Sequence, residues 1–251
     1  MSDYIISVKD LIVQYDDFVL FDNLNFNVND KDIFFIMGAS GCGKSSLLKV
    51  LTGLVAPNKG EVIIDGNNFS GASFEQKNEI MKNYGVMYQS GALFSSMSLK
   101  ENVMMPLELY SSYTETEISE LASYKLALVG LSGFDDFYPS EISGGMKKRA
   151  SLARALAMDP KIVYCDEPSA GLDPVSSKQL DDLIVELNQN LKTTFVIVSH
   201  ELSSILSIGT NSIFLDRSYK NITAFGNPKN LLATPPNKEI YKFLTRGTKQ
   251  W

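Results

Sequence analysis

The stretch IFFIMGASGCGKSSLLKVLTGL, residues 33–54, decides the fold of this chain. Ile33 to Met37 is a short apolar run that predicts a buried strand, and Ser46 to Leu54 has the composition of a helix. Between them, Gly38 to Ser45 fits the pattern G-x-x-x-x-G-K-[ST], in which a turn between strand and helix surrounds a phosphate with backbone N–H groups. Lys44 would bring a full positive charge to the β and γ oxygens, and Ser45 would place its hydroxyl on Mg²⁺. A glycine-rich turn that binds nothing is the alternative, and the order strand, loop, helix argues against it.

Outward from this loop, short apolar runs alternate with helical segments, which predicts an α/β fold with a largely parallel sheet. The runs expected as buried strands are Ile33 to Met37, Val86 to Tyr88, Ile162 to Cys165 and Phe195 to Val198. Nearer the N-terminus, Ile5 to Val13 and Val62 to Ile64 predict an antiparallel sheet, with a turn at Pro57 to Gly60.

The strand signal disappears over residues 90–158, where Glu117 to Val129 and Met146 to Met158 have helical periodicity. We therefore expect one domain over residues 1–251, with a catalytic core (1–89 and 159–226), an inserted helical subdomain (90–158) and a C-terminal helical extension (227–251). Pro235-Pro236 separates two helices in that extension, the second running from Lys238 to Leu244, and its role is not assigned.

Composition excludes several classes of function. The net charge is -6 and the sequence pI is about 4.9, which disfavours a nucleic-acid partner. Cys42 and Cys165 are the only cysteines and no signal peptide is apparent, which favours a reducing cytosol. The apolar runs are much shorter than the roughly 20 residues that span a bilayer, so we expect peripheral membrane association. Cys42, inside the phosphate loop, is expected to react with thiol reagents only when nucleotide is absent.

An acidic pair and the only histidine end two of the predicted strands. Asp166 suits a Mg²⁺ ligand, and Glu167 suits a base that polarises water for attack on the γ-phosphate. Adjacent residues on a strand point to opposite faces, so the two acids are expected to do different jobs. His200 follows Phe195 to Val198 and could hydrogen-bond the γ-phosphate. The alternatives are a solvated strand end for the acids and a structural histidine.

Ile142-Ser143-Gly144-Gly145-Met146, followed by Lys147-Lys148-Arg149, resembles the signature sequence of ABC transporter ATPases, usually written LSGGQ. A Ser-Gly-Gly turn at a helix N-terminus is a second anion site. The resemblance implies a P-loop NTPase (RecA-like) core and hydrolysis of ATP with Mg²⁺. It also implies a second copy of the chain or a related ATPase, because in this family the signature of one cassette contacts the ATP of the other.

The resemblance extends to other positions. Gln89 is similar to the glutamine that contacts Mg²⁺ and water, Ser169 to Asp173 to the segment that communicates across the dimer, and Tyr15 to the aromatic residue that stacks on adenine, although plain packing is the alternative for Tyr15. The catalytic residues implied are Lys44, Glu167 and His200, and the Mg²⁺ ligands are Ser45, Gln89 and Asp166. The nucleotide-binding residues implied are Tyr15, Gly38, Ala39, Ser40, Gly41, Cys42, Gly43, Lys44, Ser45, Ser46, Gln89, Ser143, Gly144, Gly145 and Met146.

A narrower resemblance concerns the ATPases of the Mla and Mce lipid-transport systems. It rests on Gln89 to Phe94, Asn102-Val103, Pro106-Leu107 and Glu141 to Met146, with methionine where most signatures have glutamine. This implies phospholipid transport between membranes, with a permease, an Mce-domain lipid-binding protein and a STAS-domain protein as partners at the cytoplasmic face of the inner membrane. No residue of the chain would bind lipid itself. The alternatives are an importer ATPase for another solute, a soluble ABC protein of translation or DNA repair, and a nucleotide-binding module that does not hydrolyse ATP.

Overall fold

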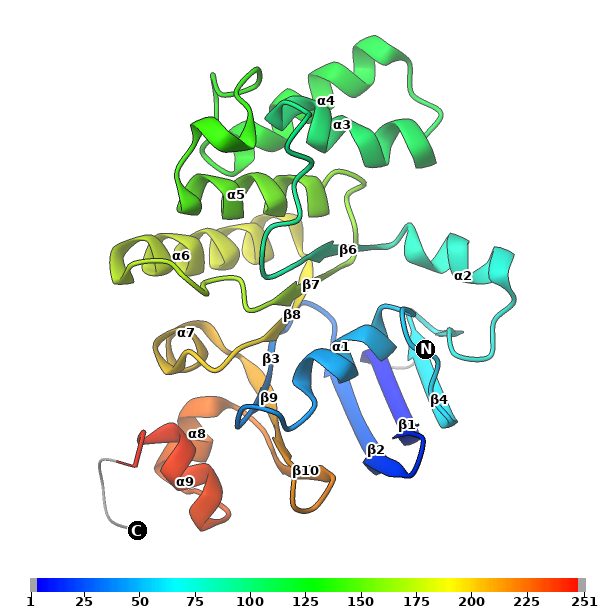
Figure 1. The fold of residues 1–251 in the computed structure, drawn as a ribbon, viewed down its shortest axis with the longest axis vertical. Helices are drawn as coiled ribbons and strands as arrows, with labels where there is room; N and C mark the ends of the chain where they lie inside the picture. Colours follow the sequence, from blue (N-terminus) through cyan, green and yellow to red (C-terminus); the bar gives the residue numbers. More distant parts are fainter. Residues whose placement is uncertain (1–3, 248–251) are drawn as a thin grey trace. The chain divides into compact units, whose positions relative to one another are not determined.

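A computed structural model describes residues 4–247, and its chain divides into two compact units (Figure 1). Unit 1 consists of Met1–Ile80 and Thr194–Trp251, and unit 2 of Met81–Thr193. The phosphate loop and His200 lie in unit 1, whereas the acidic pair, Gln89 and the signature segment lie in unit 2.

An antiparallel sheet of unit 1 has the strand order β2-β1-β4-β5. Its strands are β1 (Tyr4–Tyr15), β2 (Phe18–Asn29), β4 (Lys59–Ile64) and β5 (Asn67–Asn68). The pairs Val8 with Phe26 and Val8 with Val62 place buried residues of three strands opposite one another. The predicted antiparallel sheet is confirmed, although Lys59 and Gly60 of the predicted turn already belong to β4.

The second sheet of unit 1 is built around β3 (Ile33–Gly38), which pairs in parallel with β8 (Thr194–Val198) on one side and β9 (Asn211–Asp216) on the other. β10 (Asn221–Phe225) adds an antiparallel edge to β9. Every residue of β3 and β8 is buried, which explains why both sequences are continuous apolar runs. The helices of this unit are α1 (Lys44–Leu51), α2 (Phe74–Met81), α7 (Leu202–Ile208), α8 (Pro228–Ala233) and α9 (Lys238–Leu244).

Unit 2 contains the parallel pair β6 (Tyr84–Met87) and β7 (Ile162–Asp166) and the helices α3 (Leu99–Tyr110), α4 (Glu115–Leu128), α5 (Gly144–Ala155) and α6 (Pro174–Leu191). The 3-10 turn η1 (Pro139–Glu141) precedes α5. α3 and α4 both begin with capping boxes, Ser98 with Glu101 and Thr114 with Glu117.

β6 and α5 pack in direct contact at Gly85. A Cβ atom at this position would lie 1.8 Å from the carbonyl oxygen of Ala155, so only glycine allows the approach. This contact brings the segment that follows β6 onto α5.

The predicted strands and helices are present in the structure, most with shifted ends, but β2, α3, α6, α7, β9 and β10 were not predicted. The strand expected over Val86 to Tyr88 lies over Tyr84–Met87, and the helix expected from Met146 begins at Gly144. The boundaries of the two units differ from the predicted subdomain, since β6, β7 and α6 group with the helices; the subdomain division stays a prediction. Among residues 4–247, no helix has the length and hydropathy needed to cross a bilayer.

Candidate functional site

The phosphate loop of unit 1 connects β3 to α1 and relies on glycine at positive φ. Gly38, Gly41 and Gly43 have φ values of 150°, 75° and 100°. A Cβ at Gly38 would lie 2.5 Å from both the sulfur of Cys42 and the carbonyl oxygen of Leu215. The same atom at Gly43 would lie 2.7 Å from the ring of Phe21. The loop therefore needs glycine for conformation at all three positions and for space at Gly38 and Gly43.

Lys44 is the first residue of α1, and its side chain folds back over the loop. The Nζ atom donates hydrogen bonds to the carbonyl oxygens of Gly38 at 2.9 Å and Ala39 at 3.2 Å, and the side chain is 9% exposed. Both carbonyls are neutral, so they satisfy donors of the ammonium without neutralising its charge. A cation held this way at a helix N-terminus fits a phosphate group.

Cys42 lies inside the loop and is buried. Burial raises the pKa of its thiol, and the nearby charge of Lys44 opposes that rise. Its side chain fills the space beside Gly38, and the raised pKa makes the thiol less reactive than that of an exposed cysteine.

His200 lies at the same sheet edge as the phosphate loop. Because β3 and β8 are parallel, with Ile36 opposite Val198, their carboxyl ends leave the sheet side by side. The N–H of Ser199 donates to the carbonyl of Ile36 at 3.4 Å, and the exposed His200 follows it. The structure thus brings these two predicted site elements together in unit 1.

Tyr15 ends β1 and is 44% exposed, so it is not a core residue. The hairpin that carries it reaches the phosphate loop through Phe21, which pairs with Val13 and contacts the space beside Gly43. An exposed aromatic ring on this hairpin is suited to stacking on a planar ligand.

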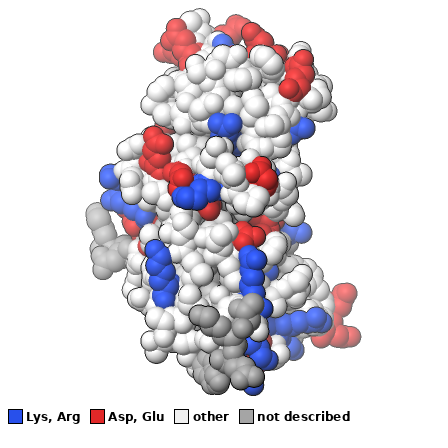
Figure 2. All heavy atoms as spheres, turned by 90° about the vertical axis from the view of Figure 1, so that its left-hand side faces the viewer, with Lys and Arg blue, Asp and Glu red and all other residues white. Residues whose placement is uncertain are grey.

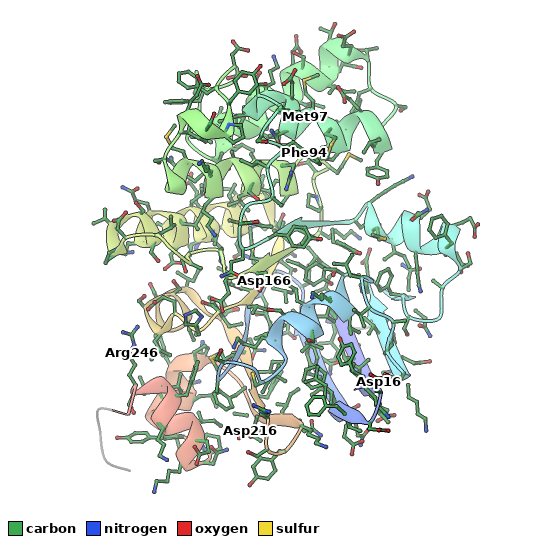
Figure 3. The ribbon with its side chains drawn as sticks, viewed as in Figure 1. Asp16, Phe94, Met97, Asp166, Asp216 and Arg246 are labelled. Atoms are coloured by element: carbon green, nitrogen blue, oxygen red, sulfur yellow. The ribbon has the colours of Figure 1, made fainter. Side chains whose placement is uncertain are left out.

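In unit 2, Gln89 and the acidic pair gather at one edge. β6 and β7 are parallel, with Met87 opposite Cys165, so both chain segments leave the pair in the same direction. Figure 3 shows Asp166 at the end of β7. Glu167 departs from the strand with φ 47°, in the left-handed region. The expectation that the two acids face opposite sides because they are neighbours on a strand is therefore wrong in its reason, since a turn begins at Glu167.

The signature segment forms the N-terminus of α5. Ser143 is the N-cap, and its hydroxyl accepts a hydrogen bond from the N–H of Met146 at 3.2 Å. Ser143 and Gly144 are exposed, while Gly145 and Met146 are half-buried. The free N–H groups of this turn are accessible to an anion.

The segment after Ser169 ends in a helix cap. Asp173 caps α6 by accepting from the N–H groups of Val175 and Ser176, and hydrogen bonding from Ser176 lowers the pKa of its carboxyl. Sequence reasoning assigned this segment to communication between two copies, which stays a prediction.

Sequence reasoning missed Lys148. This residue of α5 is buried, and its Nζ donates to the carbonyl oxygens of Gln89 and Glu167. Burial lowers its pKa, and the charges of Glu167 and Asp166 act in the opposite direction. The only signal in the sequence was its place two residues after the signature, which says nothing of its partners.

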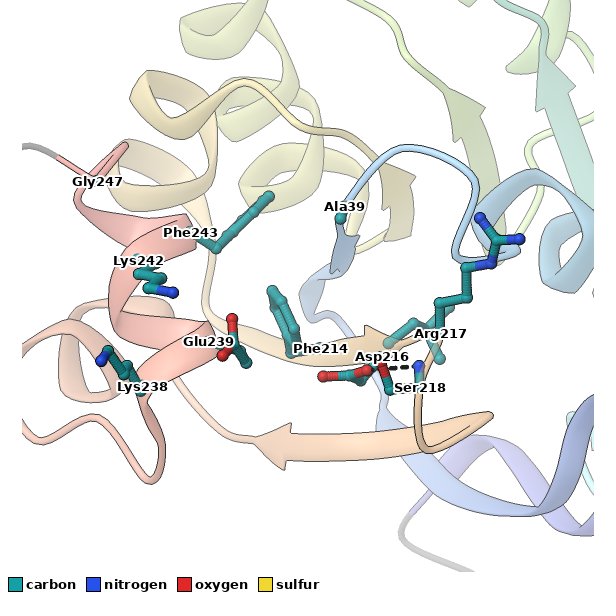
Figure 4. Close-up of a pocket in the computed structure, with 11 residues that line it drawn as sticks. Ala39, Phe214, Asp216, Arg217, Ser218, Lys238, Glu239, Lys242, Phe243 and Gly247 are labelled. Carbon is teal, nitrogen blue, oxygen red and sulfur yellow. Dashed lines mark hydrogen bonds between the residues drawn. The ribbon is translucent and has the colours of Figure 1, made fainter.

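The C-terminal helices of unit 1 pack beside the phosphate loop. Phe243 of α9 meets Phe214 of β9 with ring centroids 5.2 Å apart, and Arg246 forms an ion pair of 2.7 Å with Glu201, the residue after His200. A cavity of about 870 Å³ lies here (Figure 4), lined by Ala39, Phe214, Leu215, Asp216, Arg217, Ser218, Lys238, Glu239, Lys242, Phe243 and Gly247. Figure 2 shows Lys and Arg side chains on the surface over this part of unit 1. Charges of both signs line the cavity, so it does not select a ligand by charge.

A family model described as "ABC transporter" matches residues 21–170. The chain is 39% identical to the "Intermembrane phospholipid transport system ATP-binding protein MlaF" of Haemophilus influenzae, over 92% of this chain and 87% of that protein. It is also 39% identical to the "Probable ribonucleotide transport ATP-binding protein mkl" of Mycobacterium tuberculosis, over 95% of this chain and 66% of that protein, so the chain spans just under two thirds of the latter's length.

Among solved structures, the fold is similar to the "Dimeric structure of a post-hydrolysis state of the ATP-binding cassette MJ0796 bound to ADP and Pi". The TM-score is 0.79 and the identity 26%, over 88% of this chain and 98% of that chain.

Proposed function

Because the chain belongs to the ABC transporter family, we propose that it is the ATP-binding and ATP-hydrolysing subunit of a transporter that moves phospholipid between membranes. The observation that carries the ATPase part is the phosphate loop, where glycine geometry, the N-terminus of α1 and the ammonium group of Lys44 coincide.

The predicted residues have the following proposed roles. Lys44 and the loop N–H groups bind the β and γ phosphates, and Tyr15 stacks on the adenine. Ser45, Gln89 and Asp166 are the oxygen donors for Mg²⁺, which when bound neutralises charge that develops on the phosphate oxygens. Within residues 4–247 no three His, Cys, Asp or Glu side chains cluster as a metal site, and these donors leave coordination positions for water and phosphate.

Hydrolysis then depends on Glu167 and His200. Glu167 accepts a proton from the attacking water, and His200 hydrogen-bonds the γ-phosphate and responds to its loss. The left-handed conformation of Glu167 supports a functional role, because strained non-glycine backbone clusters at active sites.

The nucleotide is shared with a second copy of the chain. The N-terminus of α5, Ser143 to Met146, begins with two exposed residues and offers a second anion site. A single nucleotide bound at the phosphate loop of the same chain does not use this site. The dimeric state of the MJ0796 cassette supports the same arrangement here, with ATP between the phosphate loop of one copy and the signature segment of the other.

Phospholipid as the cargo rests on the relationship to the MlaF proteins of H. influenzae and Escherichia coli, each 39% identical. Residues of the narrower resemblance also have defined places: Asn102 is buried in α3, and Pro106 lies inside the same helix. The partners proposed are a transmembrane permease, an Mce-domain lipid-binding protein and a STAS-domain protein, with the ATPase held at the cytoplasmic face of the inner membrane.

A solute importer is the second candidate, because the mycobacterial relative named for ribonucleotide transport has the same identity. Affinity purification of the tagged chain from detergent-solubilised native membranes, with mass spectrometry of proteins and lipids, separates the two. A permease with an Mce-domain protein and bound phospholipid supports lipid transport. A permease with a solute-binding protein overturns the cargo and leaves the ATPase assignment standing.

A further inference from the structure

One face of α5 holds the segment that follows β6. Ser151 donates from Oγ to the carbonyl oxygen of Gly91 at 2.8 Å, and Arg154 donates to Gly91 at 3.0 Å and to Ala92 at 2.7 Å. Lys148 donates to the carbonyl oxygen of Gln89. These three helix residues are spaced by three positions and so lie on one face. Residues 89–92 are therefore hydrogen-bonded to the signature helix.

The same segment is rigid internally. The buried side chain of Asn102 accepts from the N–H of Phe94 at 2.7 Å and donates to the carbonyls of Phe94, Met97 and Ser98 at 2.9–3.2 Å. Figure 3 shows Phe94 and Met97 close together in this segment. Hydrogen bonds therefore connect residues 89–92 to α5 and residues 94–98 to Asn102 of α3.

Lys148 differs from the other two α5 residues because it has a second partner. Its Nζ lies 3.5 Å from the carbonyl oxygen of Glu167, and the side chain is 7% exposed. One ammonium group thus lies between the carbonyls of Gln89 and Glu167. Burial lowers the pKa of this ammonium group, and the charges of Glu167 and Asp166 act against that lowering.

We propose that Lys148 is a positioning residue for ATP hydrolysis, holding Gln89 and Glu167 in fixed relation through their backbone carbonyls. This inference rests on the proposed function, which gives those two residues their roles. Lys148 lies little more than one helical turn from Ser143, the N-cap of the signature helix. It therefore couples contact of that helix terminus with a nucleotide to the placement of the catalytic carboxylate.

Three replacements separate charge, hydrogen bonding and packing. Lys148→Met keeps the length of the side chain and removes both charge and donors. Lys148→Gln keeps two N–H donors without the charge. Lys148→Arg keeps both. Lys147→Met is the matched control, since the adjacent residue lies about 100° further around the helix.

The measurements are kcat, KM for ATP and the dissociation constant of ATP, made on the full chain purified with its membrane partners. We expect Lys148→Met to lower kcat by about tenfold to a hundredfold, the effect of displacing a reacting group by a fraction of an ångström or more. The affinity for ATP should change less than about twofold, because the phosphate loop is untouched. The kcat of Lys148→Gln should lie between that of Lys148→Met and that of the wild type. The kcat of Lys148→Arg should be close to that of the wild type.

A purely structural role gives a different pattern. It lowers the melting temperature in every variant and reduces kcat only in proportion to the folded fraction, which would overturn the inference. Unchanged kcat in Lys148→Met would overturn it as well. Failure of the proposed function itself is distinguishable, because the wild-type chain would then show no ATP turnover at all.

Discussion

At the scale of single residues, the two acids at the end of β7, Asp166 and Glu167, have different proposed roles, as Mg²⁺ ligand and as general base. Asp166 closes the strand and Glu167 opens the turn that follows, so the two carboxylates have different backbone geometries. The two cysteines also differ in position, since Cys42 lies in the phosphate loop and Cys165 lies inside β7.

Glu167→Gln should abolish turnover while ATP still binds. The amide keeps the size of the side chain but cannot accept the proton of water, and loss of a general base costs about 10²–10⁴-fold in rate. Phosphate release and binding of a fluorescent ATP analogue measure the two effects. Glu186→Gln, on the exposed side of α6, is the control. Unchanged turnover would remove Glu167 as the base.

Cys42 should alkylate slowly at neutral pH and faster as the pH rises, because burial raises its pKa and the thiolate is the reactive form. ATP should slow the reaction further by covering the loop. Mass spectrometry after iodoacetamide treatment measures the alkylation of Cys42 and Cys165 in the same sample. Cys165, fully buried with its pKa raised to about 12, is the internal control. Modification unaffected by ATP would place the nucleotide elsewhere.

At the scale of elements, α5 does more than present the signature. Its N-terminus is open to an anion, its C-terminal end touches Gly85 of β6, and one of its faces carries Lys148 and Arg154. One helix therefore carries both the signature segment and the contacts of Lys148 with Gln89 and of Arg154 with Ala92.

Asn102→Ala tests the hydrogen bonds between α3 and residues 94–98. The change removes one acceptor and three donor interactions of a fully buried amide and leaves the N–H of Phe94 without its partner. The free energy of unfolding should fall by about 1–3 kcal/mol. Urea unfolding followed by circular dichroism measures it, with the exposed Glu108→Ala on the same helix as control. A loss no larger than that of the control would show that this network does not stabilise the fold.

At the scale of the whole molecule, the chain supplies two anion sites but only one phosphate loop. The sites lie in different units, and the proposed function joins them through a second copy rather than within one chain. Assembly is therefore a requirement of the reaction and not an accessory to it.

Gly144→Asp tests this requirement without damaging the fold. A Cβ at Gly144 would lie 3.9 Å from its nearest neighbour, Leu172, and an acid in the first turn of a helix is favourable. The carboxylate would nevertheless repel a phosphate at the α5 N-terminus. In the Glu167→Gln background, ATP should produce a dimer that the added Gly144→Asp change abolishes.

Light scattering after size exclusion measures the dimer, and Gly144→Ala controls for the added carbon atom. An ATP-dependent dimer that persists in the Asp variant would contradict the role of Ser143 to Met146 in binding nucleotide.

The sequence by itself determined the phosphate loop, the buried strands and the signature. Each of them depends on the conformational preference or polarity of residues that are adjacent in the chain. Gly38 to Ser45 needs glycines where the backbone turns, and the runs at β3 and β8 are buried on both faces, so composition alone identifies them. β2 was missed although Asn residues alternate with its buried Leu24, Phe26 and Val28, as in a half-buried strand, because asparagine is disfavoured in strands.

Only the tertiary structure decided which distant residues share a contact. Lys148 meets Gln89 and Glu167, which are 59 and 19 positions away, and no periodicity relates such partners. Likewise, Arg246 pairs with Glu201 across 45 positions. Local patterns fix how a segment folds, whereas contacts between segments depend on how helices and strands pack. The sequence therefore predicted the residues proposed for the site, and the packing of α5 placed Lys148 between the backbone carbonyls of Gln89 and Glu167.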